Sequence, residues 1–181
     1  MQKAEDFDFE TKRAVYSQCQ GVNCPNIEIQ FLCECLSRGN SILFVTINQP
    51  YRKLEAEFAK TACNFSNKTL CDMHNVYFVD CVDVSKSSAK NVVLVKNPTL
   101  KSIEKAVISK WSKIEGKKIL FFDCAELLSS KFGQIESFNF VHSLIQKTQI
   151  EGIVILCFLE KAMDPLEATR LRHLFDQTIF L

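Results

Sequence analysis

The chain has 181 residues, 47% of them hydrophobic, and its near balance of basic and acidic side chains leaves a net charge of +1. This balance excludes the strongly basic character of a dedicated nucleic-acid-binding protein, although it leaves room for a local basic patch. Only 5 glycines and 4 prolines are present, too few for glycine-rich or low-complexity linkers. We therefore expect one soluble globular domain, residues 1–181, in which residues 1–12 form a loosely packed N-terminal segment.

Strand and helix patterns alternate along the chain. Several strand candidates are continuously apolar, as is typical of parallel strands covered on both faces, and the helix candidates have apolar residues three and four positions apart. In chain order we expect a strand over 14–17, a helix over 27–37, a strand over 41–47, a helix over 51–61, strands over 76–82 and 91–96, a helix over 99–114, a strand over 118–123, a helix over 134–149, a strand over 153–159, a helix over 165–175 and a strand over 178–181. This alternation predicts a three-layer α/β domain with a mostly parallel central sheet.

The nine cysteines are odd in number and contain no C-x-x-C pair, so we expect buried, reduced thiols. His74, His142 and His173 lie too far apart in sequence to predict a metal site. No apolar run approaches the roughly 20 residues of a membrane-spanning helix, and the acidic start lacks the regions of a signal peptide. These observations predict a cytoplasmic protein with no membrane partner and no metal.

A lysine-rich segment extends from Lys86 to Lys118 and holds only two acids, Glu104 and Glu115. The simplest interpretation is a solvated helix face with flanking loops, and the alternative is a patch that binds phosphate or an acidic partner. Its only large aromatic residue, Trp111, lies on the apolar side of the predicted helix and cannot stack on bases. We therefore expect no nucleic-acid partner.

The turn after the first strand lacks the chemistry of a phosphate-binding loop. Such a loop needs closely spaced glycines, a lysine for the phosphates and a hydroxyl for Mg²⁺. Residues 18–26 offer one glycine, Gly21, followed by Asn23, Cys24 and Pro25, with no lysine. The same residues are equally explained as a plain strand-to-helix turn.

The segment from Glu28 to Ile47, with Gln30-Phe31-Leu32 in its helix and Gly39 before its strand, resembles the helix and strand after the P-loop in RecA-like ATPases of the KaiC type. The resemblance implies a RecA-like P-loop NTPase fold. It places Cys24 at the P-loop lysine and Pro25 at the Mg²⁺-binding hydroxyl, which removes both the cation and the hydroxyl. It also places Asn48 and Gln49 at the two glutamates that activate water, and neutral amides cannot act as general bases.

Two later segments extend the resemblance over roughly residues 13–181. The run from Lys118 to Leu128 is similar to a Walker B strand, with Asp123 at the Mg²⁺-binding position, although an aspartate that ends a strand and caps a turn explains it as well. The C-terminal residues 171–181 resemble the family's last helix and strand. A closer resemblance is to uncharacterised archaeal RecA-like domains without a P-loop, through the Ile47 to Pro50 turn and the Asp164-Pro165 pair.

Three functional hypotheses follow. The first is a noncatalytic pseudo-ATPase domain without cofactor that regulates, signals or scaffolds through a protein partner or self-association, with Gly21, Asn23, Cys24, Pro25, Asn48, Gln49 and Asp123 as a vestigial nucleotide site. The alternative is a weak ATP-binding domain that recruits Mg²⁺ through Asp123 and phosphate through the lysines of 86–118. The third is an enzyme with Cys24 or Cys124 as nucleophile, which would need a base such as His142.

Overall fold

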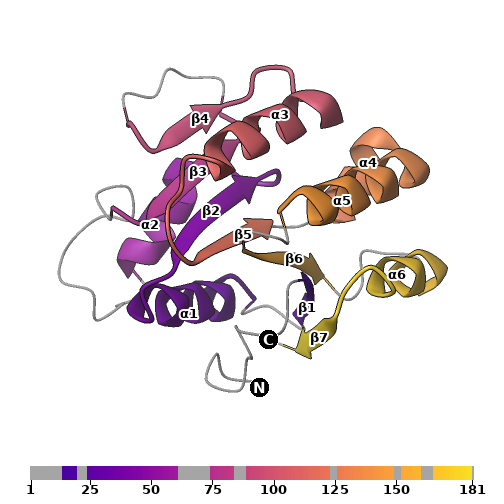
Figure 1. Cartoon of the computed structure of the whole chain (residues 1–181), viewed down its shortest axis with the longest axis horizontal. Coiled ribbons are helices and arrows are strands. Elements are labelled where there is room, and N and C mark those ends of the chain that lie inside the picture. Colours follow the sequence, from indigo (N-terminus) through magenta and orange to yellow (C-terminus); the bar gives the residue numbers. More distant parts are fainter. Residues whose placement is uncertain are drawn as a thin grey trace.

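The computed structural model describes residues 14–19, 24–60, 74–83, 89–122, 126–148, 152–159 and 165–180. Figure 1 shows how the helices and strands of these ranges are arranged. In chain order they are β1 (Ala14–Cys19), α1 (Cys24–Ser37), β2 (Ser41–Thr46), α2 (Tyr51–Lys60), β3 (Val76–Asp80), β4 (Val92–Leu94), α3 (Leu100–Trp111), β5 (Lys118–Phe122), α4 (Glu126–Phe132), α5 (Gln134–Thr148), β6 (Ile153–Leu159), α6 (Pro165–Arg172) and β7 (Gln177–Phe180).

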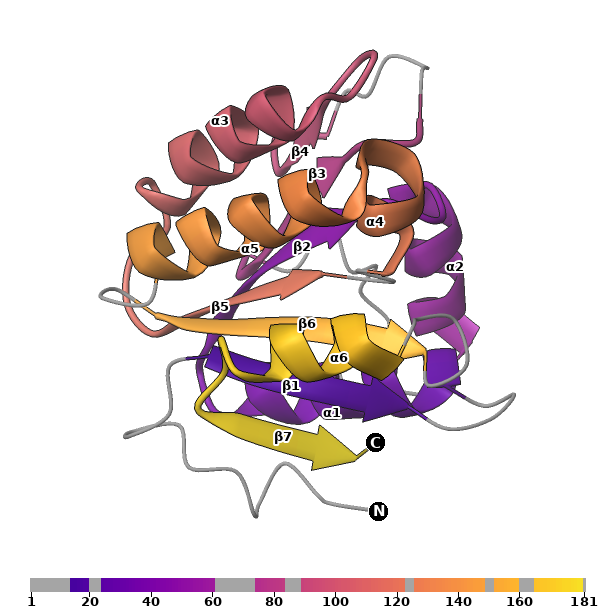
Figure 2. The ribbon, with the colours of Figure 1, turned by 90° about the vertical axis from the view of Figure 1, so that its right-hand side faces the viewer.

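The strands form one seven-stranded sheet in the order β4-β3-β2-β5-β6-β1-β7, and every neighbouring pair is parallel. Figure 2 shows this for β1, β5, β6 and β7, whose arrowheads all point to the right. The first strand lies inside the sheet, where Ala14 pairs with Val154 of β6 and Val15 pairs with Gln177 of β7. This arrangement confirms an α/β fold built on a parallel sheet.

Both faces of the sheet are apolar. Successive side chains of a strand point to opposite sides, and the central strands are apolar at nearly every position. In β2, Ile42 and Phe44 face one core, whereas Leu43 and Val45 face the other. All six residues of β2 and all five of β5 are buried. The continuously apolar runs of the sequence therefore correspond to central strands, as predicted.

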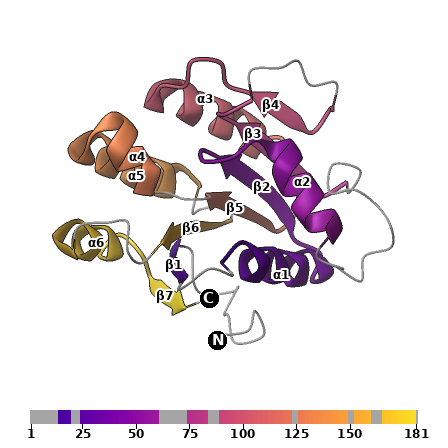
Figure 3. The same ribbon diagram turned by 180° about the vertical axis from the view of Figure 1, so that it is seen from behind.

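Helices cover both faces of the sheet. α1 and α2 pack on one face through residues such as Leu32 and Leu54, and α3 and α5 pack on the other through Val107 and Leu144 (Figures 1 and 3). α3 is fixed at its start by a capping box, in which Thr99 Oγ1 accepts from the backbone N–H of Ser102 at 3.2 Å. At its end Trp111 is 2% exposed, so the predicted apolar side of this helix is confirmed.

The end of α3 is held by two features that the sequence did not reveal. Lys118, at the start of β5, is buried, and its Nζ donates to the carbonyls of Trp111 at 3.0 Å and Ile114 at 3.1 Å. The same ammonium lies 4.8 Å from the centroid of the Trp111 ring. Gly152 lets this ring approach, because a Cβ there would lie 2.6 Å from Trp111 Cζ2. Lys118 is thus a structural cation and no part of the solvated lysine face.

Two expectations need correction. The short helix α4 was not predicted; Gly133, with a φ of 91°, separates it from α5, so the two helices are distinct. The cysteines are not all reduced, because Cys33 is disulfide-bonded. Spacing in sequence cannot reveal a pair that only the fold brings together. Cys35 and Cys81 are buried free thiols, as expected.

Candidate functional site

The carboxyl ends of the strands form one edge of the parallel sheet, and this edge is the place to look for a ligand. In open α/β sheets, ligands bind where the chain leaves two neighbouring strands toward opposite faces. β2 and β5 are such a pair, because α2 follows β2 on one face whereas α4 and α5 follow β5 on the other. β1 and β6 are a second pair, since α1 lies on the face opposite α6 in Figure 1.

The predicted site residues are distributed over three of these four strands. Cys24 and Pro25 are the first two residues of α1, after β1, and Asn48 and Gln49 follow β2. Gly21, Asn23 and Asp123 lie outside the described residues. The strands that precede them are described: β1 and β5 both pair with β6, so only one strand separates their ends.

Asn48 and Gln49 present amides at the carboxyl edge. Asn48 is exposed, and Gln49 is half-buried with its Nε2 3.4 Å from Glu57 Oε2 of α2. This hydrogen bond directs the Gln49 amide along α2. Neither amide can take a proton from water, so the described part of β2's end supplies no general base.

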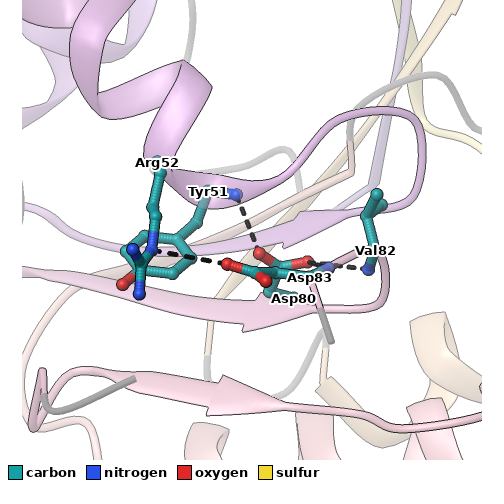
Figure 4. Close-up of polar contacts among 5 residues, drawn as sticks. All are labelled: Tyr51, Arg52, Asp80, Val82 and Asp83. Atoms are coloured by element: carbon teal, nitrogen blue, oxygen red, sulfur yellow. Dashed lines mark hydrogen bonds and ion pairs between the residues drawn. The ribbon is translucent and has the colours of Figure 1, made fainter. Parts of the chain in front are cut away.

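The best-defined polar group at this edge is Asp80, which the sequence interpretation missed. Its side chain is fully buried at the end of β3. Oδ2 accepts from the backbone N–H of Tyr51 at 2.8 Å, and Oδ1 accepts from those of Val82 at 2.7 Å and Asp83 at 2.9 Å (Figure 4). An aspartate that ends the apolar run Val76–Asp80 is the signal that could have revealed it.

These hydrogen bonds define what Asp80 can do. Tyr51 is the first residue of α2, so the carboxylate caps the positive end of this helix and also closes the turn after β3. An ion pair, Arg52 Nε to Asp83 Oδ2 at 3.4 Å, ties the same helix to the same turn. Because both Asp80 oxygens are committed to backbone donors, we assign the residue an anchoring role and no catalytic one.

Metal and nucleophile chemistry find no support among the described residues. No group of three His, Cys, Asp or Glu side chains that could hold a metal occurs within the described ranges. His142 is exposed on α5, stacked on Phe138 and 3.2 Å from Gln146 Nε2, and Cys124 lies outside those ranges. Cys35 is an inert thiol, because burial raises its pKa to about 12.

The lysines of 86–118 do not converge on the carboxyl end of β5. Lys101, Lys105 and Lys113 are exposed along and just beyond α3, which packs against α5, β2 and β3. Lys96, after β4, is at the carboxyl edge, but β3 and β2 stand between β4 and β5, a separation of about 14 Å at the usual strand spacing. Lys96, Lys101, Lys105 and Lys113 are exposed, whereas Lys118 is buried.

No helix in the described ranges is long and apolar enough to cross a membrane. No protein-family model matches the sequence, and neither does any curated protein. Two solved structures from Pyrococcus horikoshii share the fold. One is the uncharacterized protein PH0321 in complex with an unknown peptide, with a TM-score of 0.64, 13% identity, and coverage of 94% of this chain and 78% of that chain. The other is PH0250, with a TM-score of 0.65, 9% identity, and coverage of 99% and 87%.

Proposed function

We propose that this chain is a noncatalytic domain with the architecture of RecA-like ATPases of the KaiC type, and that it works through protein contacts in regulation, signalling or scaffolding. The observation that carries the proposal is the pair of neutral amide side chains at the end of β2. The resemblance calls there for two glutamates that activate water, and the chain has Asn48 and Gln49, with the Gln49 amide bonded to Glu57.

The arrangement of the strands supports the RecA-like part of this proposal. The segments that the resemblance assigns to a nucleotide site follow β1, β2 and β5, and these strands end at one edge of one sheet. α1 starts with Cys24 and Pro25, so its first turn brings neither a phosphate-binding lysine nor a Mg²⁺-binding hydroxyl to that edge. The fold would thus keep the place of the site and lose its chemistry.

The protein-contact part has separate support. PH0321, which shares the fold at low sequence identity, was crystallised with a peptide bound. A fold of this kind can therefore hold a polypeptide. Under the proposal, this chain also takes a protein partner or a second copy of itself.

The alternative is a weak ATP-binding domain, and the position of the lysines counts against it. That reading needs cations near the carboxyl end of β5, whereas β4 lies beyond β2 and β3 and the lysines Lys101 and Lys105 of α3 are exposed to solvent. Lys118, the first residue of β5, donates to the carbonyls of Trp111 and Ile114 and lies at the opposite end of the strand. A missing P-loop lysine also removes several charge-assisted hydrogen bonds to phosphate.

Calorimetric titration with ATP and Mg²⁺ tests the proposal. We expect no saturable heat up to about 1 mM ATP, an affinity limit of about −4 kcal/mol. Restoring the missing groups in a Cys24→Lys/Pro25→Thr variant provides the positive control, because it returns the cation and the hydroxyl to the start of α1. Saturable binding to the wild type that disappears in Asp123→Ala would contradict the proposal and establish a remodelled nucleotide site.

A further inference from the structure

The outer side of α3 carries a concentration of positive charge, and three of its lysines, Lys101, Lys105 and Lys113, are exposed. Lys101 and Lys105 are exposed on successive turns, and Lys113 is exposed two residues after the helix ends. Lys110 lies on the flank toward β4, where its Nζ is 3.5 Å from the carbonyl oxygen of Lys90 and 4.8 Å from the centroid of the Tyr77 ring. We call Lys90, Lys101, Lys105, Lys110 and Lys113 the α3 lysine face.

Within the described ranges, no acidic side chain neutralises this face. The ion pairs found there join Arg52 to Asp83, Lys53 to Glu57 and Lys147 to Glu104. Glu104 is the only acid in α3, and it points to α5, where Oε1 accepts from Lys147 at 2.9 Å and from Ser143 at 2.7 Å. The acid of the helix is therefore committed on the flank opposite Lys110.

This arrangement is unfavourable for the helix itself. Like charges four residues apart repel each other, and Lys101 places a cation in the first turn, where the helix dipole favours an anion. The first turn of α3 contains no acid, and its capping box uses Ser102 where a glutamate is common. Burial, followed by the charge of Lys113, lowers the pKa of Lys110. A partner with negative charge would offset the repulsion between these lysines and supply the anion that the first turn of α3 lacks.

The side chains around the lysines indicate an acidic polypeptide as this partner. A single-stranded nucleic acid would need exposed aromatic rings for base stacking, and Trp111 is buried. A membrane surface would need exposed apolar side chains beside the lysines, and the two large exposed apolar residues of the described ranges, Ile135 and Leu166, lie on α5 and α6. The face instead offers separate point charges, which suit carboxylates spaced along a chain.

We infer that the α3 lysine face is the docking surface for an acidic segment of a protein partner. The inference rests on the proposed protein-contact function and names the surface that serves it. Electrostatic docking of this kind accelerates association and weakens as salt is added.

A fluorescently labelled poly-L-glutamate of about 20 residues serves as the probe, a length that spans the helix when extended. We expect the full chain to bind it in low salt, and Lys101→Gln/Lys105→Gln/Lys113→Gln to lose at least about tenfold in affinity. Lys101→Arg/Lys105→Arg/Lys113→Arg keeps the charges and should bind within about twofold of the wild type. Circular dichroism verifies that both variants are folded.

The matched control removes three exposed cations elsewhere, in Lys53→Gln/Lys131→Gln/Arg170→Gln on α2, α4 and α6. It changes the net charge equally and should leave affinity within about twofold. Equal losses in both glutamine variants, no binding of poly-L-glutamate, or tighter binding of oligo-dT or of phosphatidylserine vesicles would overturn the inference. All titrations omit nucleotide, so a failure here is distinguishable from ATP binding, which would contradict the noncatalytic proposal instead.

Discussion

Asp80 is a fully buried carboxylate, and the three backbone N–H groups around it explain why the fold tolerates it. A buried charge without partners would be strongly destabilising, whereas one that accepts several short hydrogen bonds can be retained. The residue joins the end of β3 to the start of α2 and fixes the turn that bears Asp83. It therefore holds together the part of the carboxyl edge that includes the loop of Asn48 and Gln49.

Replacing Asp80 by alanine should lower the free energy of unfolding by about 3 kcal/mol or more, because it leaves the N–H groups of Tyr51, Val82 and Asp83 without their acceptor. Asp80→Asn should cost less, since one amide oxygen still accepts. Urea denaturation measures both. Arg52→Ala is the neighbouring control, because its exposed ion pair with Asp83 is worth about 1 kcal/mol at most. An alanine variant no less stable than the Arg52→Ala protein would refute this account.

At this scale, the sequence predicts positions better than roles. Asn48 and Gln49 were placed at the end of a buried strand from the apolar run before them, and they are there. Asp80 follows the same pattern as Asp123, yet it was overlooked because no motif called for an acid after β3. The anchoring role of Lys118 was equally hidden, since nothing in its neighbours distinguishes it from the exposed lysines of the same segment.

Between elements, the clearest polar link joins α3 to α5 through Glu104, Ser143 and Lys147. The hydrogen bond from Lys147 lowers the pKa of Glu104, with that from Ser143 adding to it. A carboxyl whose pKa is lower in the folded than in the unfolded state stabilises the fold above its unfolded pKa. That contribution is lost as the pH falls through the lower, folded pKa.

The wild type should therefore lose more stability than Glu104→Gln between about pH 6 and about pH 3, the range that spans the ordinary glutamate pKa. The extra loss should stay within about 1 kcal/mol, because Lys147 is half exposed. Urea titrations at both pH values measure it. Glu115→Gln, which changes an exposed acid, should follow the wild type. If the Glu104→Gln curve is parallel to that of the wild type, the link contributes nothing.

The elements themselves were largely predictable because their physical signals are local. Continuous apolar runs identified the central strands, and the spacing of Ile103, Val107 and Trp111 identified α3. β4 and α4 are the weak cases. β4 spans only three residues, and α4 is a seven-residue helix that ends at a left-handed glycine, too short for a periodic pattern to emerge.

For the whole molecule, the disulfide at Cys33 distinguishes a protein that contains a disulfide from one whose nine cysteines are all reduced. Disulfides are uncommon in the reducing cytosol, where we expected the protein to reside. Alkylation of the denatured protein without reductant should leave at least two of the nine cysteines unmodified, and prior reduction should expose all nine. Mass spectrometry counts the modified thiols. Lysis in the presence of the alkylating agent excludes oxidation during purification, and nine modified cysteines without reductant would show that the bond does not form.

The order of the strands was beyond the reach of the sequence, because it depends on pairings between distant segments. The alternation of strand and helix predicted a parallel sheet but left open which strands are neighbours. The sequence therefore did not reveal that β1 lies between β6 and β7, or that β2 and β3 separate β4 from β5. The order of the strands decides which of the predicted site residues lie close together.

The central position of β1 has a consequence for synthesis on the ribosome. A nascent chain emerges from its N-terminus, so β1 leaves the exit tunnel first. Its two neighbours, β6 and β7, belong to the last part of the chain, and Ala14 must wait for Val154 before it can pair. β2, β3 and β5 can assemble beforehand, because each finds a neighbour within the emerged chain. Of the seven strands of this sheet, β1 is therefore translated first and is among the last to be enclosed.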